Sequence, residues 1–323
     1  MTLSRRAILP LAALPFAAPA LAQSRWPDRA VKIVVPFAPG GTTDIVARLL
    51  AAQLQERLGQ PFVAENRPGA GGTLAAGQVA LAAPDGYTLV ISNSASNGIS
   101  PSLFENVRYD PLEDFAHIAL AATTSNAMTV NARHEAKTVA DLIAMAKASP
   151  DGLHYAHAGN GTTTHLLGLR FALAAGIKLN PVAYRGSGPA ITDVVAGNVM
   201  LIFDGVPSSI TQIRAGNLRA LAVADPAPNA RLPGVPTFAQ AGYANLVSFS
   251  WFGLSAPKGT PPEIVALLNR EVRAILAQPG IRARADELIA DLADTSPDQY
   301  RQFIREELAT WSAVVRATGA TAN

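Results

Sequence analysis

The chain has 323 residues, of which 49% are hydrophobic and 15% are charged. This composition is typical of a globular protein, and the length is sufficient for two domains that each bury a core. The sequence contains no cysteine, so disulfide bonds, thiol catalysis and thiolate metal sites are excluded.

The first 22 residues have the layout of a cleavable export signal. Arg5 and Arg6 precede an uncharged apolar stretch that ends in Ala20-Leu21-Ala22. We therefore predict cleavage after Ala22 and a periplasmic mature protein, exported by either the general secretory or the twin-arginine route. The stretch is interrupted by prolines, and no later stretch has the ~20 consecutive apolar residues of a membrane helix, so no membrane insertion is expected.

The net positive charge of the chain belongs to this segment. The whole chain has 26 Lys and Arg against 24 Asp and Glu, and removal of residues 1–22 takes away two arginines and no acid, which leaves 24 of each. Nucleic-acid binding depends on an excess of positive charge that neutralises phosphates. We therefore expect no nucleic-acid partner.

Short apolar segments alternate with segments of helical periodicity along the chain. Residues 31–36 are predicted as a strand, and residues 43–58 as a helix that ends at Gly59. The short-strand pattern recurs at 62–65, 88–92, 154–156, 182–184, 201–203 and 220–223. Alternation of this kind predicts parallel sheets with crossover helices, an α/β fold.

Three helix starts combine a hydroxyl residue with an acid or amide three positions later. They occupy residues 138–141, 260–263 and 296–299. In such a capping box, the hydroxyl accepts a hydrogen bond from the backbone of the first turn. We interpret all three as structural N-caps.

No flexible linker follows the export signal, so two domains are expected to be joined by ordered strands. The candidate connections are residues 118–130 and 247–257. The predicted lobe 1 comprises residues 23–123 and 250–323, and lobe 2 comprises residues 124–249 as an insertion.

A glycine-rich turn follows the first strand, at the end of the strand where open parallel sheets bind ligands. Gly40 and Gly41 allow a ligand to approach the backbone. Thr42 and Thr43 offer hydroxyl groups, and Asp44 can cap the first helical turn. The turn is either a simple connection between strand and helix or an anion site.

Two further glycine-rich turns, at residues 158–168 and 184–193, favour the anion site. Backbone N–H groups from three such turns can converge on one ligand in a cleft between two lobes. The nucleotide motifs G-x-x-x-x-G-K-[ST] and G-x-G-x-x-G are absent from the sequence, so no cofactor is expected.

Several polar residues have two interpretations. His154 and His157 lie three residues apart on a predicted strand and therefore point to opposite faces, so they are interpreted as structural and no metal site is predicted. Asp204, at the end of the strand 201–203, either accepts a hydrogen bond from a ligand or caps the next helix. Trp251 is interpreted as core or hinge packing rather than as a residue that stacks on a ligand.

An exported α/β hydrolase is the alternative function. Ser187 lies between two glycines, as a nucleophile could, but the sequence shows no base for it and no G-x-S-x-G motif. Such a hydrolase would turn over an ester or amide, whereas a binding protein would not.

The order of several motifs resembles the Bug receptors, the periplasmic solute-binding proteins of the tripartite tricarboxylate transporter family. The motifs are VKIVVPFAPGGTTDIVAR, VAENRPGAGG, APDGYTL, AGNGTTTHL, YRGSGPA, IFDG and WFGLSAPKGTP, and they cover nearly the whole mature chain. The resemblance implies a type II periplasmic-binding-protein fold, in which two α/β lobes joined by two crossover strands close around a small carboxylate. It also implies a non-enzymatic receptor that delivers its ligand to membrane transporter subunits, and we expect a monomer.

The resemblance places the ligand-binding residues in two groups. The first group grips one carboxylate and consists of Phe37, Ala38, Gly40, Gly41, Asp44, Gly159, Gly161, Thr162 and Thr163. The second group lies where the ligand's other end would be and consists of Ser92, Tyr184, Gly186 and Asp204. The sequence departs from the family pattern at His157, where serine is common, and at Ala183, where proline is frequent.

Overall fold

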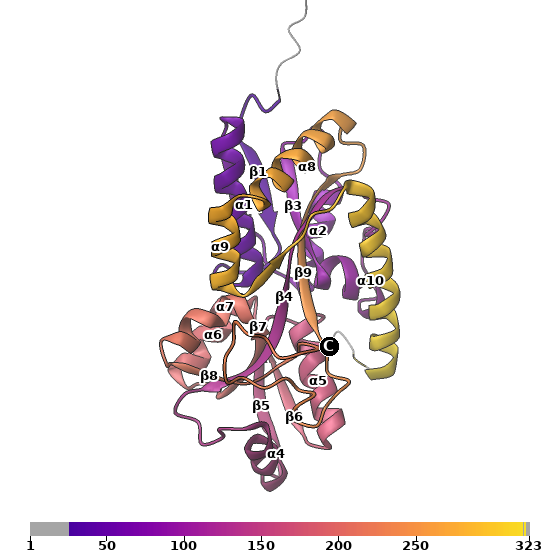
Figure 1. Ribbon diagram of the computed structural model, residues 1–323. Helices are drawn as coiled ribbons and strands as arrows, with labels where there is room; N and C mark the ends of the chain where they lie inside the picture. Colours follow the sequence, from indigo (N-terminus) through magenta and orange to yellow (C-terminus); the bar gives the residue numbers. More distant parts are fainter. Residues whose placement is uncertain (1–25, 319, 321–323) are drawn as a thin grey trace, which may run out of the picture.

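The structure, a computed structural model, describes residues 26–318 and 320. The predicted export signal and its cleavage after Ala22 lie outside the described residues. This described part is mixed α/β, with ten strands in one curled sheet and helices packed against it, in two halves that lie one above the other in Figure 1. Within the described residues, no helix is both long enough and apolar enough to cross a membrane.

The upper half of Figure 1 contains three parallel strands in the order β2-β1-β3. These strands are β1 (Val31–Val35), β2 (Phe62–Asn66) and β3 (Thr88–Asn93). The helices of this half are α1 (Thr42–Leu58), α2 (Thr73–Ala80), α3 (Ser100–Leu103), α8 (Pro262–Leu276), α9 (Pro279–Leu288) and α10 (Pro297–Thr318). The strand and helix predicted at 31–36 and 43–58 are confirmed by β1 and α1. As predicted, α1 ends at Gly59, whose φ of 74° is a left-handed conformation that glycine adopts without strain.

The lower half of Figure 1 repeats this architecture. Its strands are β5 (Leu153–His157), β6 (Leu179–Ala183), β7 (Leu201–Gly205) and β8 (Leu218–Val223). Its helices are α4 (Val139–Ala148), α5 (Thr163–Ala175), α6 (Ser187–Ala196) and α7 (Val206–Arg214). β5 pairs in parallel with both β6 and β7. The strand predicted at 182–184 begins earlier, at Leu179, because the whole segment 179–183 pairs with β5.

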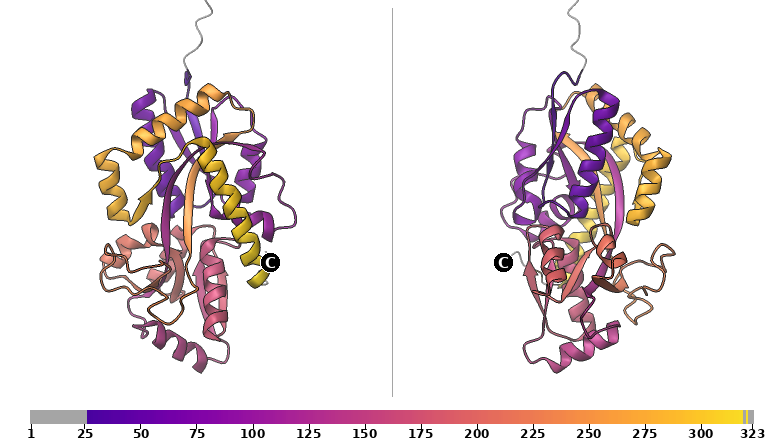
Figure 2. Two further views of the ribbon diagram at one scale, coloured as in Figure 1. Left: turned by 45° about the vertical axis from the view of Figure 1, so that its right-hand side comes forward. Right: turned by 90° about the vertical axis from the view of Figure 1, so that its left-hand side faces the viewer.

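Two long strands run from one half into the other (Figure 2). They are β4 (Phe115–Asn131) and β9 (Phe249–Pro257), and they pair in antiparallel fashion with each other. The last residues of β4 then pair with β7 and β8 of the lower half, and the short β10 (Ala290–Leu292) pairs with its middle. The connections predicted at 118–130 and 247–257 therefore correspond to β4 and β9. The division into lobes at residues 123 and 249 stays a prediction.

Two of the three predicted N-caps are confirmed. At the start of α4, the Asp141 N–H donates to Thr138 Oγ1 at 3.1 Å and the Thr138 N–H donates back to Asp141 Oδ2 at 2.9 Å. At the start of α10, the same reciprocal pair joins Ser296 and Gln299 at 3.2 and 2.8 Å. Both pairs satisfy backbone donors that the helix itself cannot satisfy.

The predicted N-cap at Thr260 is wrong. α8 begins at Pro262, its N-cap residue is Pro261, and no side chain caps it. The Thr260 hydroxyl donates instead to the Pro257 carbonyl oxygen at 2.8 Å. A residue before a proline disfavours the helical conformation, so Pro261 is extended with ψ of 132° and the helix starts one residue later than predicted. Thr260 is left to close the turn after β9.

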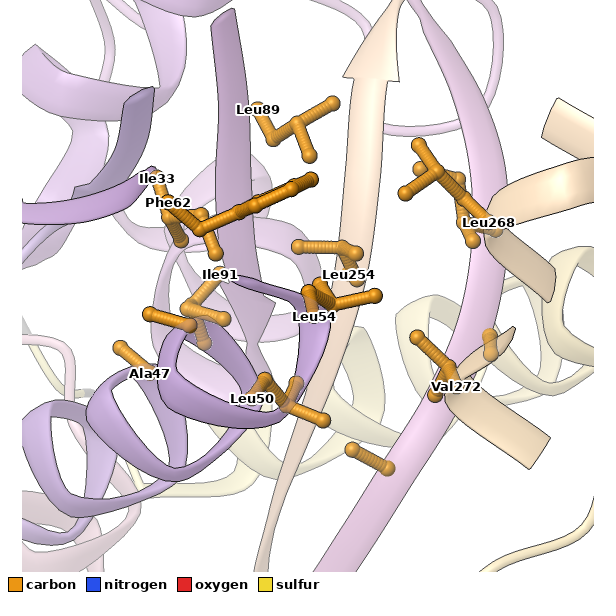
Figure 3. Close-up of a cluster of buried hydrophobic side chains, with 14 of the residues drawn as sticks. Ile33, Ala47, Leu50, Leu54, Phe62, Leu89, Ile91, Leu254, Leu268 and Val272 are labelled. Carbon is orange, nitrogen blue, oxygen red and sulfur yellow. The ribbon is translucent and has the colours of Figure 1, made fainter. Parts of the chain in front are cut away.

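A large hydrophobic core fills the upper half between the sheet and the helices α1 and α8. Figure 3 shows Leu50 and Leu54 of α1 facing Ile91 of β3 and Leu254 of β9, with Leu268 and Val272 of α8 on the other side. Burial of each such side chain contributes about 1.5–3 kcal/mol. A second core in the lower half, around Tyr155, holds α5 against β5 and β7. These two cores fix the ends of the strands that surround the site.

Candidate ligand-binding site

A cavity of about 50 Å³ lies between the two halves. Two phenylalanines, Phe37 and Phe252, supply apolar walls, and most other lining residues are serine, threonine or glycine. No charged side chain and no histidine is among its lining residues in the described part of the chain. Its volume is sufficient for a few groups the size of water, such as a carboxylate with a short carbon chain.

Three helices that begin at this cavity have uncapped N-termini. The N-cap residues of α1, α6 and α7 are Gly41, Gly186 and Gly205, and none provides a side-chain cap. Gly41 and Gly205 line the cavity directly, and Ser187, the first residue of α6, lines it beside them. The N–H groups of a first helical turn have no acceptor within the helix, so those present are left for a ligand; Pro189 in α6 and Pro207 in α7 have no N–H group.

A fourth helix, α5, also begins at the cavity. Its N-cap Thr162 accepts a hydrogen bond from the His165 N–H at 3.2 Å, which leaves the N–H groups of the intervening residues without that cap. Thr162, Thr163 and Thr164 all line the cavity. The wall is completed by the segment after β3, where a π-helix, η2 (Ser94–Ile99), begins with Asn93 as its N-cap.

The four helix starts make the cavity electropositive without a cationic side chain. Each helix N-terminus carries about half a positive elementary charge. A negative group at one exposed N-terminus gains roughly 0.3–1 kcal/mol, and more where it is partly buried. The arrangement is therefore suited to an anion with several acceptor oxygens, such as a carboxylate.

The Asp44 carboxylate holds the first turn, residues 36–41, in place and does not line the cavity. The Gly40 N–H donates to Asp44 Oδ2 at 3.1 Å, and Arg48 and Asn66 donate to the same carboxylate at 2.9–3.0 Å. Burial raises the pKa of Asp44, but these hydrogen bonds outweigh it, so the pKa lies below its ordinary value. Asp44 is therefore an ionised anchor that shapes the turn.

Two stacked histidines support the second turn, residues 158–162. The rings of His157 and His165 lie 4.6 Å apart, and their Nδ1 atoms accept from the Gly159 and Gly161 N–H groups at 3.2 and 3.4 Å. Burial lowers the pKa of His157 to about 3 and that of His165 to about 4, so both rings are neutral at pH 7. No cluster of His, Asp or Glu in the part of the chain that the structure describes could hold a metal ion.

The first turn touches the third turn, residues 184–188, across the gap between the halves. The Ala38 N–H donates to the Arg185 carbonyl oxygen at 2.8 Å. Nearby, a Cβ atom on Gly188 would lie only 2.1 Å from the Pro39 carbonyl oxygen. The two backbones therefore meet at a distance that only glycine permits, and the first and third turns are in direct contact.

Asp204 lies behind the cavity wall. It is fully buried, and its carboxylate accepts hydrogen bonds from Ser187 at Oδ1 and from Ser208 and Ser209 at Oδ2, the latter two at 2.6 Å. Burial raises its pKa, while the hydrogen bonds from the serines and from the Gly205 backbone lower it. The side chain that faces the cavity at this position is Ser187.

Ser92 and Tyr184 lie outside the cavity lining. Ser92 is buried between β3 and β9, where its hydroxyl donates to Ser255 Oγ at 2.8 Å. The Tyr184 hydroxyl donates to Asp193 Oδ2 at 2.7 Å, and its N–H donates to the His157 carbonyl oxygen at 3.1 Å. Tyr184 therefore joins the second and third turns.

Of the thirteen predicted site residues, four line the cavity: Phe37, Gly41, Thr162 and Thr163. Six others belong to the turns that carry these residues to the cavity or support them: Ala38, Gly40, Asp44, Gly159, Gly161 and Gly186. Asp204 lies behind Ser187, which lines the cavity, and Ser92 and Tyr184 lie outside the lining.

The predicted list omitted eleven of the fifteen lining residues. Six of the eleven lie in the predicted turns or at helix starts: Thr42, Thr43, Ala158, Thr164, Ser187 and Gly205. The other five form two parts of the wall that no predicted turn includes. One is Asn93, Ser94 and Ala95, at the start of the small polar run SNSASNGIS after β3. The run follows a strand as the glycine turns do, which is the feature that could have identified it. The other part is Ser250 and Phe252, which reach the cavity only because β9 crosses between the halves.

The cavity lacks the arrangement of a hydrolase. No serine or threonine of its wall is hydrogen-bonded to a histidine ring within residues 26–318 and 320. The Ser255 and His117 side chains do lie 3.3 Å apart, but both are buried outside the cavity lining. Ser255 does not line the cavity, so a substrate there would not reach it. Burial also lowers the pKa of His117 to about 4.

Comparison with known proteins agrees with this geometry. The family model described as tripartite tricarboxylate transporter family receptor matches residues 46–320. The protein BugT of Bordetella pertussis is 38% identical over 311 residues, which cover 96% of this chain and 95% of BugT.

Solved structures show the same fold. MatC from Rhodopseudomonas palustris, with bound malate, has a TM-score of 0.85 at 35% identity and covers 90% of this chain and 100% of its own. An R. palustris protein solved with adipate has a TM-score of 0.88 at 37% identity, covering 92% and 99%. The periplasmic binding protein BugD has a TM-score of 0.88 at 32% identity, with the same coverage.

These matches confirm the predicted periplasmic-binding-protein fold, and they give no support to the alternative of an exported hydrolase. The family consists of receptors rather than enzymes. The chain belongs to the tripartite tricarboxylate transporter receptor family, the periplasmic solute-binding proteins that include the Bug proteins.

Proposed function

We propose that this protein captures one small organic carboxylate in the cavity between its halves and delivers it to the membrane subunits of a tripartite transporter. The observation that carries the proposal is the convergence of the N-termini of α1, α5, α6 and α7 on a cavity without charged side chains. Two relatives of similar fold were solved with carboxylates, adipate in one and malate in the other.

Backbone donors alone can provide a useful affinity. A hydrogen bond to a charged group contributes about 1.5–3 kcal/mol. Four such bonds contribute about 6–12 kcal/mol, a range that includes the roughly −8.2 kcal/mol of a micromolar dissociation constant. A cationic side chain is not required for capture.

Capture and closure are coupled in this proposal. A ligand that contacts α1 of the upper half and α5 of the lower half binds the closed form better than an open one, and so shifts the population toward it. We propose that the moving bodies are lobe 1, residues 23–123 and 250–323, and lobe 2, residues 124–249, with β4 and β9 as the connection. We further propose that the receptor acts as a monomer in the periplasm, after removal of residues 1–22.

Isothermal titration of ligand-free protein tests the proposal. The protein is first unfolded and refolded to remove any co-purified ligand, then titrated with mono-, di- and tricarboxylates of increasing length. We expect at least one acid to bind with a micromolar or lower dissociation constant. Its primary amide, a neutral analogue of the same shape, is the matched control and should bind at least ~100-fold more weakly.

Two results would contradict the proposal. One is a lack of binding by every acid in a broad panel with refolded, ligand-free protein. The other is equal binding of an acid and its amide, since helix N-termini favour the negative charge.

A further inference from the structure

The cavity wall carries eight serine or threonine hydroxyls, and the directions of their hydrogen bonds say which chemical groups the wall can accept. Each hydroxyl has one hydrogen to donate and two lone pairs that accept. A hydroxyl whose hydrogen is already directed to a protein acceptor presents only lone pairs to a ligand. This inference rests on the proposed function, because it concerns what accompanies the captured carboxylate.

Ser187 presents lone pairs. Its hydrogen is directed to Asp204 Oδ1. Ser208 and Ser209 donate to the other oxygen, Oδ2, both at 2.6 Å, so in the ionised carboxylate Oδ1 is the acceptor for Ser187. Ser187 lines the cavity, and its hydroxyl hydrogen points away from the cavity, toward Asp204.

Thr42 is in the same situation. Its hydroxyl lies 3.2 Å from Ser208 Oγ, which links the starts of α1 and α7. The Ser208 hydrogen is directed to Asp204 or to the Gly205 carbonyl oxygen, both acceptors. Thr42 must therefore be the donor in its contact with Ser208, and its lone pairs are left for the cavity.

Thr163 is fixed by a chain of three hydrogen bonds. The Asn126 amide nitrogen donates to Ser248 Oγ at 3.0 Å, so the Asn126 oxygen is the atom that accepts from Ser250 Oγ at 3.0 Å. Because the Ser250 hydrogen is used in this way, Thr163 donates to Ser250 across their 2.6 Å contact. Thr163 also presents lone pairs to the cavity.

The remaining hydroxyls form two groups, those that can only accept a hydrogen bond from a ligand and those that can donate one. Thr162 donates to the Gly159 carbonyl oxygen at 2.7 Å, which makes Thr164 the donor in their 3.0 Å contact. Thr43 makes no hydroxyl hydrogen bond to the described residues, and Ser94 accepts one from the Trp251 N–H, so the hydrogens of Thr43 and Ser94 are free to reach a ligand.

The wall therefore has two chemical sides. Backbone N–H groups together with Thr43 and Ser94 donate to a carboxylate, while Ser187, Thr42 and Thr163 offer oxygens that can only accept. A ligand with carboxylate oxygens alone would place acceptors against these acceptors. We infer that the preferred ligand carries a hydroxyl group close to its carboxylate, that is, a small hydroxy acid, and that Ser187 is a main acceptor of this hydroxyl.

A hydroxyl fits this side of the wall better than an ammonium group. The helix N-termini surround the whole cavity with positive partial charge, which disfavours a cation. The lining residues include no acidic side chain within the described part of the chain, and the carboxylate of Asp204 is already satisfied by three serines. Asp204 acts here as a positioning residue, since it directs the Ser187 hydrogen away from the ligand.

The test compares ligands that differ by one donor. Isothermal titration of the refolded protein measures the dissociation constants of malate against succinate and of lactate against propionate. We expect the hydroxy acid of the pair that fits to bind about tenfold more tightly or better, since a site built to hydrogen-bond a hydroxyl rejects an analogue without it. 2-Methoxysuccinate keeps the oxygen but lacks the donor and should bind no better than succinate, and aspartate should bind more weakly than malate.

Variants then assign the preference to Ser187. In Ser187→Ala the preference for the hydroxy acid should fall to less than about threefold. The matched control is Ser209→Ala, which removes another hydroxyl from Asp204 without touching the cavity wall and should keep the preference of the wild type.

The variant Asp204→Asn tests the role of the carboxylate. It introduces an N–H donor toward Ser187 and frees the Ser187 hydrogen, so the affinity for malate should fall while succinate binds as well as before or better. A purely structural role of Asp204 would weaken both ligands equally.

The outcomes separate this inference from the proposed function. Equal binding of hydroxy and unsubstituted acids by the wild type overturns the inference and leaves carboxylate capture intact. Tighter binding of aspartate than of malate overturns the choice of a hydroxyl. Absence of binding by every acid overturns both. The ligand series uses the wild-type protein, so it decides the matter even where a variant fails to fold.

Discussion

At the scale of single residues, Thr43 is a hydroxyl-bearing residue of the cavity wall. Its side chain lines the cavity and makes no hydrogen bond to the described residues. Thr43→Val keeps the shape of the side chain and removes the hydroxyl. We expect the ligand's dissociation constant to rise by about tenfold or more, because a hydrogen bond to a carboxylate contributes about 1.5–3 kcal/mol. Isothermal titration measures the change.

The matched control for this substitution is Thr124→Val in β4. The Thr124 hydroxyl is also buried and has no partner among the residues that the structure describes, but it lies outside the cavity lining. Its replacement should leave ligand affinity within about twofold of the wild type, since no ligand bond is lost. Equal losses in the two variants would show that Thr43 does not contact the ligand.

His157 makes the stability of the protein depend on pH. Its pKa of about 3 in the folded state lies below the ~6.5 of an unfolded chain, so the unfolded state binds the proton more readily below pH 6.5. Its contribution is therefore complete above pH 6.5 and is lost progressively as the pH falls toward 3. Between pH 7 and pH 5 the loss is about 2 kcal/mol, at 1.36 kcal/mol for each pH unit below 6.5.

The variant His157→Asn isolates this effect. The amide oxygen can still accept the Gly159 N–H that His157 accepts, but the side chain does not titrate. Urea unfolding at pH 7 and pH 5 should show the wild type losing about 2 kcal/mol more than the variant over this range. The other buried histidines, His117 and His165, are present in both proteins. A difference that stays constant between pH 7 and pH 5 would mean that His157 is not buried in its neutral form.

At the scale of elements, the start of α6 controls how closely the first and third turns approach. A Cβ atom on Gly188 would collide with the Pro39 carbonyl oxygen, so Gly188→Ala prevents the observed approach. The same change favours the helix itself by roughly 0.5–1 kcal/mol. We expect ligand affinity to fall by about tenfold or more while thermal stability without ligand is unchanged or raised.

Gly280→Ala is the matched control for this substitution. Gly280 is the second residue of α9, as Gly188 is of α6, and a Cβ atom there would meet nothing within 4 Å. It should gain the same helical stability and keep wild-type affinity in isothermal titration. If Gly188→Ala binds ligand as tightly as Gly280→Ala, the contact between the turns does not contribute to the bound state.

Elements with a local sequence pattern were predictable. β1, the glycine turn and α1 follow one another as a strand, a flexible turn and a helix with a glycine stop, and the structure has them at the expected residues. The N-caps at Thr138 and Ser296 follow the same local logic, and Thr260 fails because the prolines after it shift the start of α8. Local rules succeed where the decisive atoms lie within one helical turn.

Site residues supplied by tertiary pairing were not predictable. Ser250 and Phe252 line the cavity because of the register between β9 and β4, which places Phe252 opposite Ala122. Asp204 lies in β7, next to its last residue Gly205, close to the strand end that the sequence suggested, but only the contact between α6 and Asp204 shows that Ser187 stands between Asp204 and the cavity. A single sequence carries no information on such distances.

At the scale of the whole molecule, the two halves are connected by β4 and β9 and also touch at the cavity, where Ala38 contacts Arg185. Small-angle X-ray scattering of ligand-free protein should show a larger radius of gyration than the ligand-bound protein, because the ligand favours closure by its differential affinity. The neutral amide of the same acid is the control and should leave the radius unchanged. A radius that is identical with and without bound acid would contradict a closing motion.

The use of main-chain donors at the starts of four helices has a consequence for engineering. Substitution of a side chain leaves the peptide N–H in place. Substitutions in the cavity wall therefore do not remove the backbone donors that attract an anion. A combinatorial library restricted to Ser187, Ser250 and Phe252 could therefore alter which acid is preferred without abolishing uptake of acids as a class. Such a scaffold is a starting point for a set of metabolite biosensors that use the same backbone donors and differ in the acid that they bind.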